Sequence, residues 1–305
     1  MALTELLRKF QALPIYGELL EGLPALPSFT SLHAPRSIRP MLVAALNDSL
    51  RRPILLLTNR KERFLPLNEE ISAWTERPVQ LFPEPNPLFY QKSGWGPRTR
   101  QSRSAALALL SANRQPGIPE DYQEPPLVLA SARAIMTRTL SPRQYLTSSR
   151  VLKTGSRFPL DSISQLLVET GYDPRSLVTE PGQFSRRGGI LDVWPPAEPF
   201  PIRLDFFGDE LESLRRFQPA TQRSLETIPW VRITPAREAL PRLYREDWNS
   251  ILPPDADTIA SRQELLEFFL PVMNPDAYNL IDFLPENALV LVDDLEIFKE
   301  NVSTI

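Results

Sequence analysis

The chain contains few of the side chains that commonly carry out chemistry. Among its 305 residues there is no cysteine and only one histidine, His33. The lack of cysteine excludes disulfides, thiolate nucleophiles and cysteine-ligated zinc, and it fits a reducing compartment. A single histidine excludes a two-histidine metal site and allows a Ser-His-Asp triad only around His33. We therefore expect no catalytic residue and no metal site.

A phosphate-binding loop is also missing from the sequence. Such a loop has the pattern G-x-x-x-x-G-K-[ST], because the glycines let backbone N–H groups surround the phosphates, the lysine neutralises them and the hydroxyl holds magnesium. No such string occurs in this chain. The sequence therefore predicts neither a nucleotide cofactor nor ATP hydrolysis.

Arginine and aromatic residues meet on one face of the expected strand Phe200–Phe207. Side chains alternate along a strand, so one face should be apolar and form core. The opposite face carries Arg203, Asp205 and Phe207, and Arg187 at the start of the neighbouring strand can reach it. Arginine beside an aromatic residue is typical of a protein-binding surface. The alternative is that Phe207 packs under the following helix while the arginines pair locally with Asp205 or Asp209.

The overall composition indicates neither a membrane protein nor a polyanion binder. Lys and Arg total 34 against 37 Asp and Glu, so the formal net charge is −3 and any DNA contact would need a local patch. No apolar run approaches the roughly 20 residues that a membrane helix needs. The first ten residues, MALTELLRKF, lack the features of a signal peptide and predict a short helix. We expect a cytoplasmic protein.

Helical and strand-like segments alternate in the first half of the chain, which is typical of a parallel sheet with crossover helices. The expected strands are Pro53–Thr58, Val79–Phe82 and Pro126–Ala130. The expected helices are Met41–Leu50, Asn68–Trp74 and Ser102–Ala112. Near the other end, the apolar strand Ala288–Val292 could rejoin this sheet, and it ends in Asp293 and Asp294.

From about Val151 the pattern changes, which indicates a second domain. Asp161 can cap a helix that Gly171 ends. The strands Ile190–Trp194 and Phe200–Phe207 follow, joined by a proline-rich turn, and we expect them to pair antiparallel. Beyond Ala236 the sequence predicts mostly helix.

Several long strings resemble one family of bacterial repair proteins. RGGILDVWPP, PIRLDFFGDELESLRRF and TQRS resemble the second domain shared by the transcription-repair coupling factor (Mfd) and the excision-repair protein UvrB. VETGYDPRSLVTEPGQFSRRGG and DFLPENALVLVDD stand in the family's order, so the resemblance covers nearly the whole chain. It implies that this domain binds the damage-recognition ATPase UvrA through Arg187, Arg203 and Phe207.

The resemblance also implies an α/β fold with two domains. A degenerate RecA-like, P-loop-type domain with a parallel sheet would comprise residues 1–150 and 236–305. The smaller α+β domain, with an antiparallel sheet, would be inserted at residues 151–235 and bind UvrA. Asp293 and Asp294 would take the place of the family's magnesium-binding and catalytic acidic pair, although a solvated turn is the alternative. Where the nucleotide loop would lie, Leu32–Pro40 has neither glycine nor lysine.

The two relatives differ in a DNA-probing hairpin. UvrB-type proteins insert a long, tyrosine-rich hairpin into the first domain, where aromatic rings stack on nucleotides. Here the segment Leu88–Gln101 leaves room only for a short loop. A weak nucleic-acid patch and a solvated loop with one packed aromatic residue are both compatible with its aromatic and basic residues, Tyr90, Lys92, Trp95, Arg98 and Arg100.

The function that the resemblance implies is non-catalytic: a module of transcription-coupled nucleotide excision repair that recruits UvrA to stalled RNA polymerase. The family's full-length proteins are ATP-dependent DNA translocases that contact RNA polymerase and DNA through other domains, so we expect this chain to be a fragment. In the parent, another domain is expected to mask the UvrA-binding surface. Two alternatives remain, an active UvrB-like ATP-dependent protein that probes DNA for damage, and a scaffold fragment without a specific partner.

Overall fold

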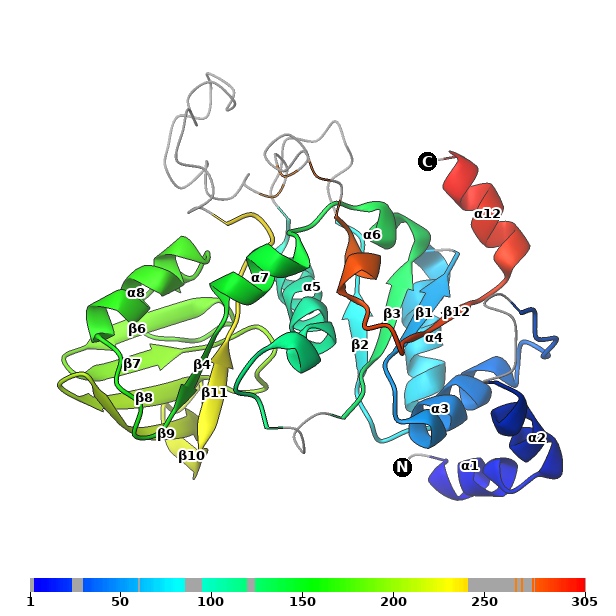
Figure 1. The fold of residues 1–305 in the computed structure, drawn as a ribbon, viewed down its shortest axis with the longest axis horizontal. Coiled ribbons are helices and arrows are strands. Elements are labelled where there is room, and N and C mark those ends of the chain that lie inside the picture. Colours follow the sequence, from blue (N-terminus) through cyan, green and yellow to red (C-terminus); the bar gives the residue numbers. More distant parts are fainter. Residues whose placement is uncertain are drawn as a thin grey trace. The chain divides into compact units, whose positions relative to one another are not determined.

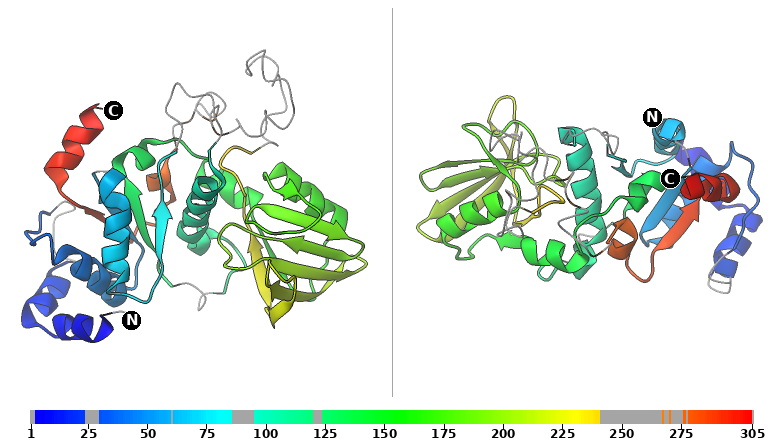
Figure 2. Two further views of the ribbon diagram at one scale, coloured as in Figure 1. Left: turned by 180° about the vertical axis from the view of Figure 1, so that it is seen from behind. Right: turned by 90° about the horizontal axis from the view of Figure 1, so that it is seen from above.

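The chain divides into two compact units, which are visible in Figures 1 and 2. The computed structural model describes residues 3–23, 30–59, 61–85, 95–119, 124–240, 267, 270, 276 and 278–304. Unit 1 comprises residues 1–81, 124–132 and 286–305, and unit 2 comprises residues 82–123 and 133–285. The expected inserted domain, residues 151–235, lies entirely in unit 2, which also includes the segments before and after it.

Unit 1 is built on a four-stranded sheet with the strand order β12-β1-β3-β2. The central strand β1 (Ile54–Thr58) pairs in parallel with both β3 (Leu127–Ser131) and β12 (Leu289–Val292). The remaining strand, β2, is Val79–Phe82. Every residue of β1 and β3 is buried, as expected of parallel strands that are covered on both faces. The predicted parallel sheet, and the return of the chain into it after residue 288, are confirmed.

Helices from several parts of the chain complete the core of unit 1. They are α1 (Thr4–Gln11), α2 (Pro14–Gly22), α3 (Arg39–Leu50), α4 (Lys61–Ser72) and α12 (Leu295–Thr304). Leu7 of α1, Tyr16 of α2 and Ile71 of α4 join the apolar side chains of β1 and β3 in one core cluster. Helix α4 begins seven residues before the predicted Asn68 and contains Pro66, a residue type that normally breaks a helix.

Unit 2 contains a six-stranded sheet with the order β10-β9-β8-β7-β6-β5. Its strands are β5 (Asp173–Pro174), β6 (Gln183–Arg187), β7 (Ile190–Val193), β8 (Ile202–Phe207), β9 (Glu210–Phe217) and β10 (Ser224–Thr227). All neighbours pair antiparallel except β5 and β6, which are parallel. A separate antiparallel pair joins β4 (Arg150–Lys153) to β11 (Trp230–Ile233). The predicted antiparallel pairing of the two strands around the proline-rich turn is confirmed.

Helix α8 (Leu160–Glu169) covers one face of the six-stranded sheet (Figure 1). Its Ile163 and Leu167 pack with Leu191 and Leu204 of the sheet in the core of this unit. The predicted cap is wrong: Pro159 occupies the N-cap position, and Asp161 in the first turn instead forms an ion pair with Arg186. The predicted end is confirmed, since the chain leaves the helix through Gly171, whose φ is +87°.

The other elements of unit 2 lie outside the sheets. They are α5 (Pro97–Leu110), η2 (Ala112–Arg114), α6 (Ala132–Met136, which begins at the unit boundary), α7 (Pro142–Ser148) and η6 (Leu280–Phe283). The helical sequence predicted after Ala236 falls largely outside the described residues. None of the described helices combines the length and the hydropathy of a membrane span.

The segment Leu88–Gln101 is described only from Trp95 onward. Trp95 is buried, and the guanidinium of Arg103 lies 4.7 Å from the centre of its ring. Arg98 and Arg100 lie in the first turn of α5, whereas Tyr90 and Lys92 are outside the described residues. Of the two interpretations, the part that the structure describes fits the one with a packed aromatic residue.

Candidate functional site

The outward face of the six-stranded sheet carries the residues that the strand alternation predicted. Along β8 the apolar residues Ile202, Leu204 and Phe206 are buried. Phe207 points the other way and is 78% exposed, so the alternative in which it packs under a helix is wrong. The two-face division of this strand is confirmed.

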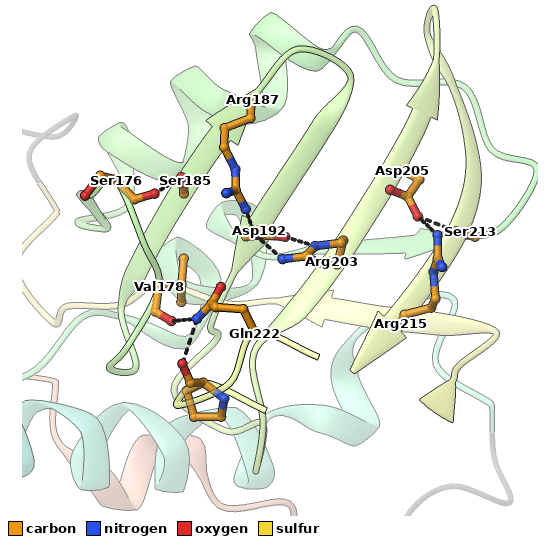
Figure 3. Close-up of polar contacts among 11 residues, drawn as sticks. Ser176, Val178, Ser185, Arg187, Asp192, Arg203, Asp205, Ser213, Arg215 and Gln222 are labelled. Carbon is orange, nitrogen blue, oxygen red and sulfur yellow. Dashed lines mark hydrogen bonds and ion pairs between the residues drawn. The ribbon is translucent and has the colours of Figure 1, made fainter. Parts of the chain in front are cut away.

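One buried carboxylate joins the two predicted arginines (Figure 3). Asp192 Oδ2 accepts a hydrogen bond from Arg187 Nη2 at 2.8 Å. Arg203 donates from Nε to Asp192 Oδ1 at 2.7 Å and from Nη2 to Oδ2 at 2.8 Å. The local pairing that we considered, with Asp205 or Asp209, is wrong for both arginines. The register explains the difference, because Asp192 on β7 lies directly opposite Arg203 on β8.

The two guanidinium groups differ in exposure. The side chain of Arg187 is 51% exposed and that of Arg203 is 18% exposed, while Asp192 between them is 1% exposed. The guanidinium of Arg203 also lies 4.8 Å from the centre of the Phe217 ring. The hydrogen bonds to Asp192 are the main cause of a raised pKa of Arg203, so this group stays charged at any physiological pH.

A second ion pair continues the same face toward β9. Asp205 accepts hydrogen bonds from the Ser213 hydroxyl at 2.7 Å and from Arg215 (Figure 3). Arg215 lies directly opposite Arg203 in the β8–β9 register. Three arginines and two aspartates give this group of five a formal charge of +1. The chain as a whole has a formal net charge of −3.

Two tight hairpins bring Arg187 and Phe207 to the same end of the sheet. Gly188 and Gly189 connect β6 to β7, and Gly208 and Asp209 connect β8 to β9. The first glycine of each turn has a φ of +60°, which is the conformation such hairpins favour. Because β6 and β8 both run opposite to β7, their last residues, Arg187 and Phe207, lie near the same end of the sheet.

The two aspartates after β12, Asp293 and Asp294, form ion pairs within unit 1. Arg39 Nη1 donates to Asp293 Oδ1 at 2.7 Å, and Arg36 Nη2 donates to Asp294 Oδ2 at 2.6 Å. Both arginines come from the segment at the start of α3, where the resemblance would place the nucleotide loop. These residues line an open cavity of about 700 Å³, together with the ion pair of Arg63 and Glu70. Among the described residues, no three histidine or carboxylate side chains are grouped as metal ligands.

Sequence reasoning missed Asp192 and Arg215. Asp192 and Arg215 lie beside Arg203 because of the register between β7, β8 and β9. The sequence of one strand alone does not reveal this register. The two-residue turns Gly188–Gly189 and Gly208–Asp209 would have fixed the β6–β7 and β8–β9 registers, but not the β7–β8 register that puts Asp192 opposite Arg203.

This surface lies within a segment that a protein-family comparison recognises. Residues 151–238 match the UvrB interaction domain. The matched segment thus covers α8, the whole six-stranded sheet, β11 and all but the first residue of β4. This match confirms the resemblance of this region to the second domain of Mfd and UvrB.

Similar proteins that cover larger parts of the chain come from the same group. It is 27% identical to the transcription-repair-coupling factor of Bacillus subtilis over 294 residues, which cover 87% of this chain and 24% of that protein. The corresponding protein of Escherichia coli is 27% identical over 275 residues, 85% of this chain and 23% of that protein. UvrABC system protein B of Thermus thermophilus is 30% identical over 134 residues, 41% of this chain and 20% of that protein. The chain therefore spans about a quarter of the length of the coupling factors that it matches.

Proposed function

We propose that the UvrB interaction domain of this chain binds UvrA through the outward face of β6 to β8, and that the chain is a non-catalytic module that recruits UvrA to stalled RNA polymerase. We name the surface formed by Arg187, Arg203 and Phe207 the arginine–phenylalanine surface. The observation that carries the proposal is the 78% exposure of Phe207 at the same end of the sheet as Arg187.

The chemistry of this surface suits a protein partner. An exposed phenyl ring gains from burial against another protein, and arginine can bind a carboxylate through two parallel hydrogen bonds. Aromatic and arginine side chains are also those that most often dominate binding energy at interfaces. The two arginines of this surface favour carboxylates on the partner.

The ion pairs of unit 1 are the reason why we do not propose ATP hydrolysis for this chain. In a nucleotide site, an acidic pair at a strand end would hold magnesium and act on water. Here Arg36 and Arg39 already neutralise Asp294 and Asp293. We therefore propose that the chain binds neither ATP nor magnesium tightly, and that DNA translocation and polymerase contacts belong to parts of longer relatives. The proposed setting is the bacterial cytoplasm.

Measuring the affinity for purified UvrA tests this function directly. The full chain and its Arg203→Ala and Phe207→Ala variants would be titrated against UvrA by calorimetry or surface plasmon resonance. Each variant should bind UvrA more weakly by on the order of 2 kcal/mol, or about 30-fold in Kd, because truncating a dominant interface residue typically costs this much.

Matched controls come from the other end of β9. Arg223, in the turn before β10, and Leu225, on β10, are both exposed and lie away from Phe207. Arg223→Ala and Leu225→Ala should leave the Kd unchanged. If all five proteins bind UvrA equally, the site assignment is wrong, and if none binds, the partner is wrong.

Titration with labelled ATP separates this function from the active UvrB-like alternative. The proposed module should show no magnesium-dependent binding. Tight, magnesium-dependent binding of ATP would favour the alternative instead.

A further inference from the structure

We propose that Asp192 is a positioning residue for partner binding: its buried carboxylate holds the guanidinium groups of Arg187 and Arg203 side by side at the arginine–phenylalanine surface. This inference rests on the proposed function and assigns a role to a residue that does not itself reach the partner.

The geometry assigns Asp192 an indirect role. Its side chain is 1% exposed, so the two arginines above it separate it from any partner. All three hydrogen bonds between these groups are short, at 2.7 to 2.8 Å, and Oδ2 accepts from both arginines at once. A single oxygen, Asp192 Oδ2, thus accepts hydrogen bonds from both guanidinium groups and fixes their orientation (Figure 3).

Fixing the arginines before binding lowers the entropic cost of association. An unrestrained arginine side chain has more rotamer entropy to lose on binding than most other side chains. A group that is already held in its bound geometry loses less, so affinity rises without any new contact. An arginine carries five N–H donors, and the bonds of Arg203 to Asp192 use two of them. The restraint therefore does not exhaust the donors that a partner carboxylate would need.

Asp192 also makes the two cations compatible with each other. Guanidinium groups that converge on one spot repel, and the carboxylate between them compensates one of the two charges. The remaining formal charge of +1 is directed outward, since Arg187 is the most exposed member of the trio. Without Asp192, the two arginines would carry an uncompensated charge of +2, and repulsion would separate them into many conformations.

The test is a double-mutant cycle with UvrA as the probe. Asp192→Asn keeps the size of the side chain but removes its charge, so it should weaken UvrA binding by about 10-fold or more. In a background that carries Arg187→Ala and Arg203→Ala, the same substitution should change the Kd by less than about twofold, because nothing remains to be positioned. Thermal unfolding of every protein in the cycle reports whether it is folded.

A second measurement needs no partner and remains valid if binding is weak. In NMR spectra of the free chain, the Nε–H signal of Arg203 should be ordered and slow to exchange in the wild type. In Asp192→Asn it should become mobile and exchange quickly with water.

The outcomes separate this inference from the function on which it rests. If the wild type does not bind UvrA, the proposed function fails. If the arginine variants lose binding while Asp192→Asn binds like the wild type, the function stands and the positioning role is overturned. A loss from Asp192→Asn that persists in the double-alanine background, or an unchanged Arg203 signal, also overturns it, because Asp192 would then act only on the stability of the fold.

Discussion

Arg103 and Arg203 of unit 2 show how burial decides whether an ion pair can contribute to binding as well as to stability. Arg103 is completely buried, and its guanidinium donates to both carboxylate oxygens of Glu238 at 2.5 and 2.9 Å. It also lies 3.9 Å from the centre of the Phe82 ring. Arg203 forms the same kind of bidentate pair but keeps 18% of its side chain exposed. The first pair can act only on the stability of the unit, whereas the second can also contact a partner.

At this scale we predict that Glu238→Ala strongly destabilises unit 2. The substitution leaves Arg103 buried without its carboxylate, which typically costs about 3–5 kcal/mol. The free energy of unfolding in urea measures the effect. Glu226→Ala is the matched control, since Glu226 pairs with Arg216 but is 60% exposed, and it should cost less than about 1 kcal/mol. Equal losses from the two substitutions would contradict the prediction.

At the scale of elements, the β6–β7 hairpin sets where Arg187 stands. Its turn residue Gly189 accepts a hydrogen bond at its carbonyl from the Phe206 N–H at 2.9 Å. A Cβ atom on Gly189 would lie 2.7 Å from the carbonyl oxygen of Phe206, closer than real Cβ contacts occur. The hairpin and β8 can therefore approach this closely only because Gly189 has no side chain.

We predict that Gly189→Ala separates the hairpin from β8. The clash is with backbone, which cannot rotate away, so the substitution should cost about 1–3 kcal/mol and weaken UvrA binding by moving Arg187. Thermal unfolding and the UvrA titration check both effects. Gly17→Ala is the control, because nothing lies within 4 Å of its Cβ position and Gly17 is inside α2. That change should be neutral or stabilising by up to about 1 kcal/mol.

The elements also show what the sequence could predict. The two faces of β8 and the parallel strands β1 and β3 follow from the local pattern of apolar residues, and these predictions are confirmed. The start of α4 at Lys61 was not predicted, and Pro66, a residue type that normally breaks a helix, lies inside this one. The role of Asp192 was missed because its partners lie on two other strands, and pairing across strands depends on register rather than on local pattern.

At the scale of the whole molecule, buried tyrosines link stability to alkaline pH. Burial raises the pKa of Tyr145 to about 12, although the Arg232 guanidinium acts in the opposite direction. Burial also raises the pKa of Tyr172, whose hydroxyl donates to the carbonyl of Thr234 at 2.6 Å. Both groups must be neutral in the folded state, so ionisation favours unfolding.

We therefore predict a loss of stability between pH 10 and pH 12. Since the folded-state pKa of Tyr145 exceeds its ordinary value of 10, its contribution is complete below pH 10 and is lost as the pH rises toward 12. A shift of this size corresponds to roughly 3 kcal/mol. Melting temperatures measured from pH 8 to pH 12 should fall less steeply for Tyr145→Phe than for the wild type. Parallel curves for the two proteins would contradict the prediction.

The position of β12 determines where the polypeptide tolerates truncation. This strand comes from residues 289–292, yet it covers one side of β1, and Asp293 and Asp294 just beyond it bind arginines more than 250 positions earlier in the chain. A recombinant protein that stops before residue 289 would uncover the backbone of ILLLT, an apolar strand edge of the kind that recruits other chains. We expect such a product to aggregate on expression, while one that extends past Asp294 keeps β1 paired with β12.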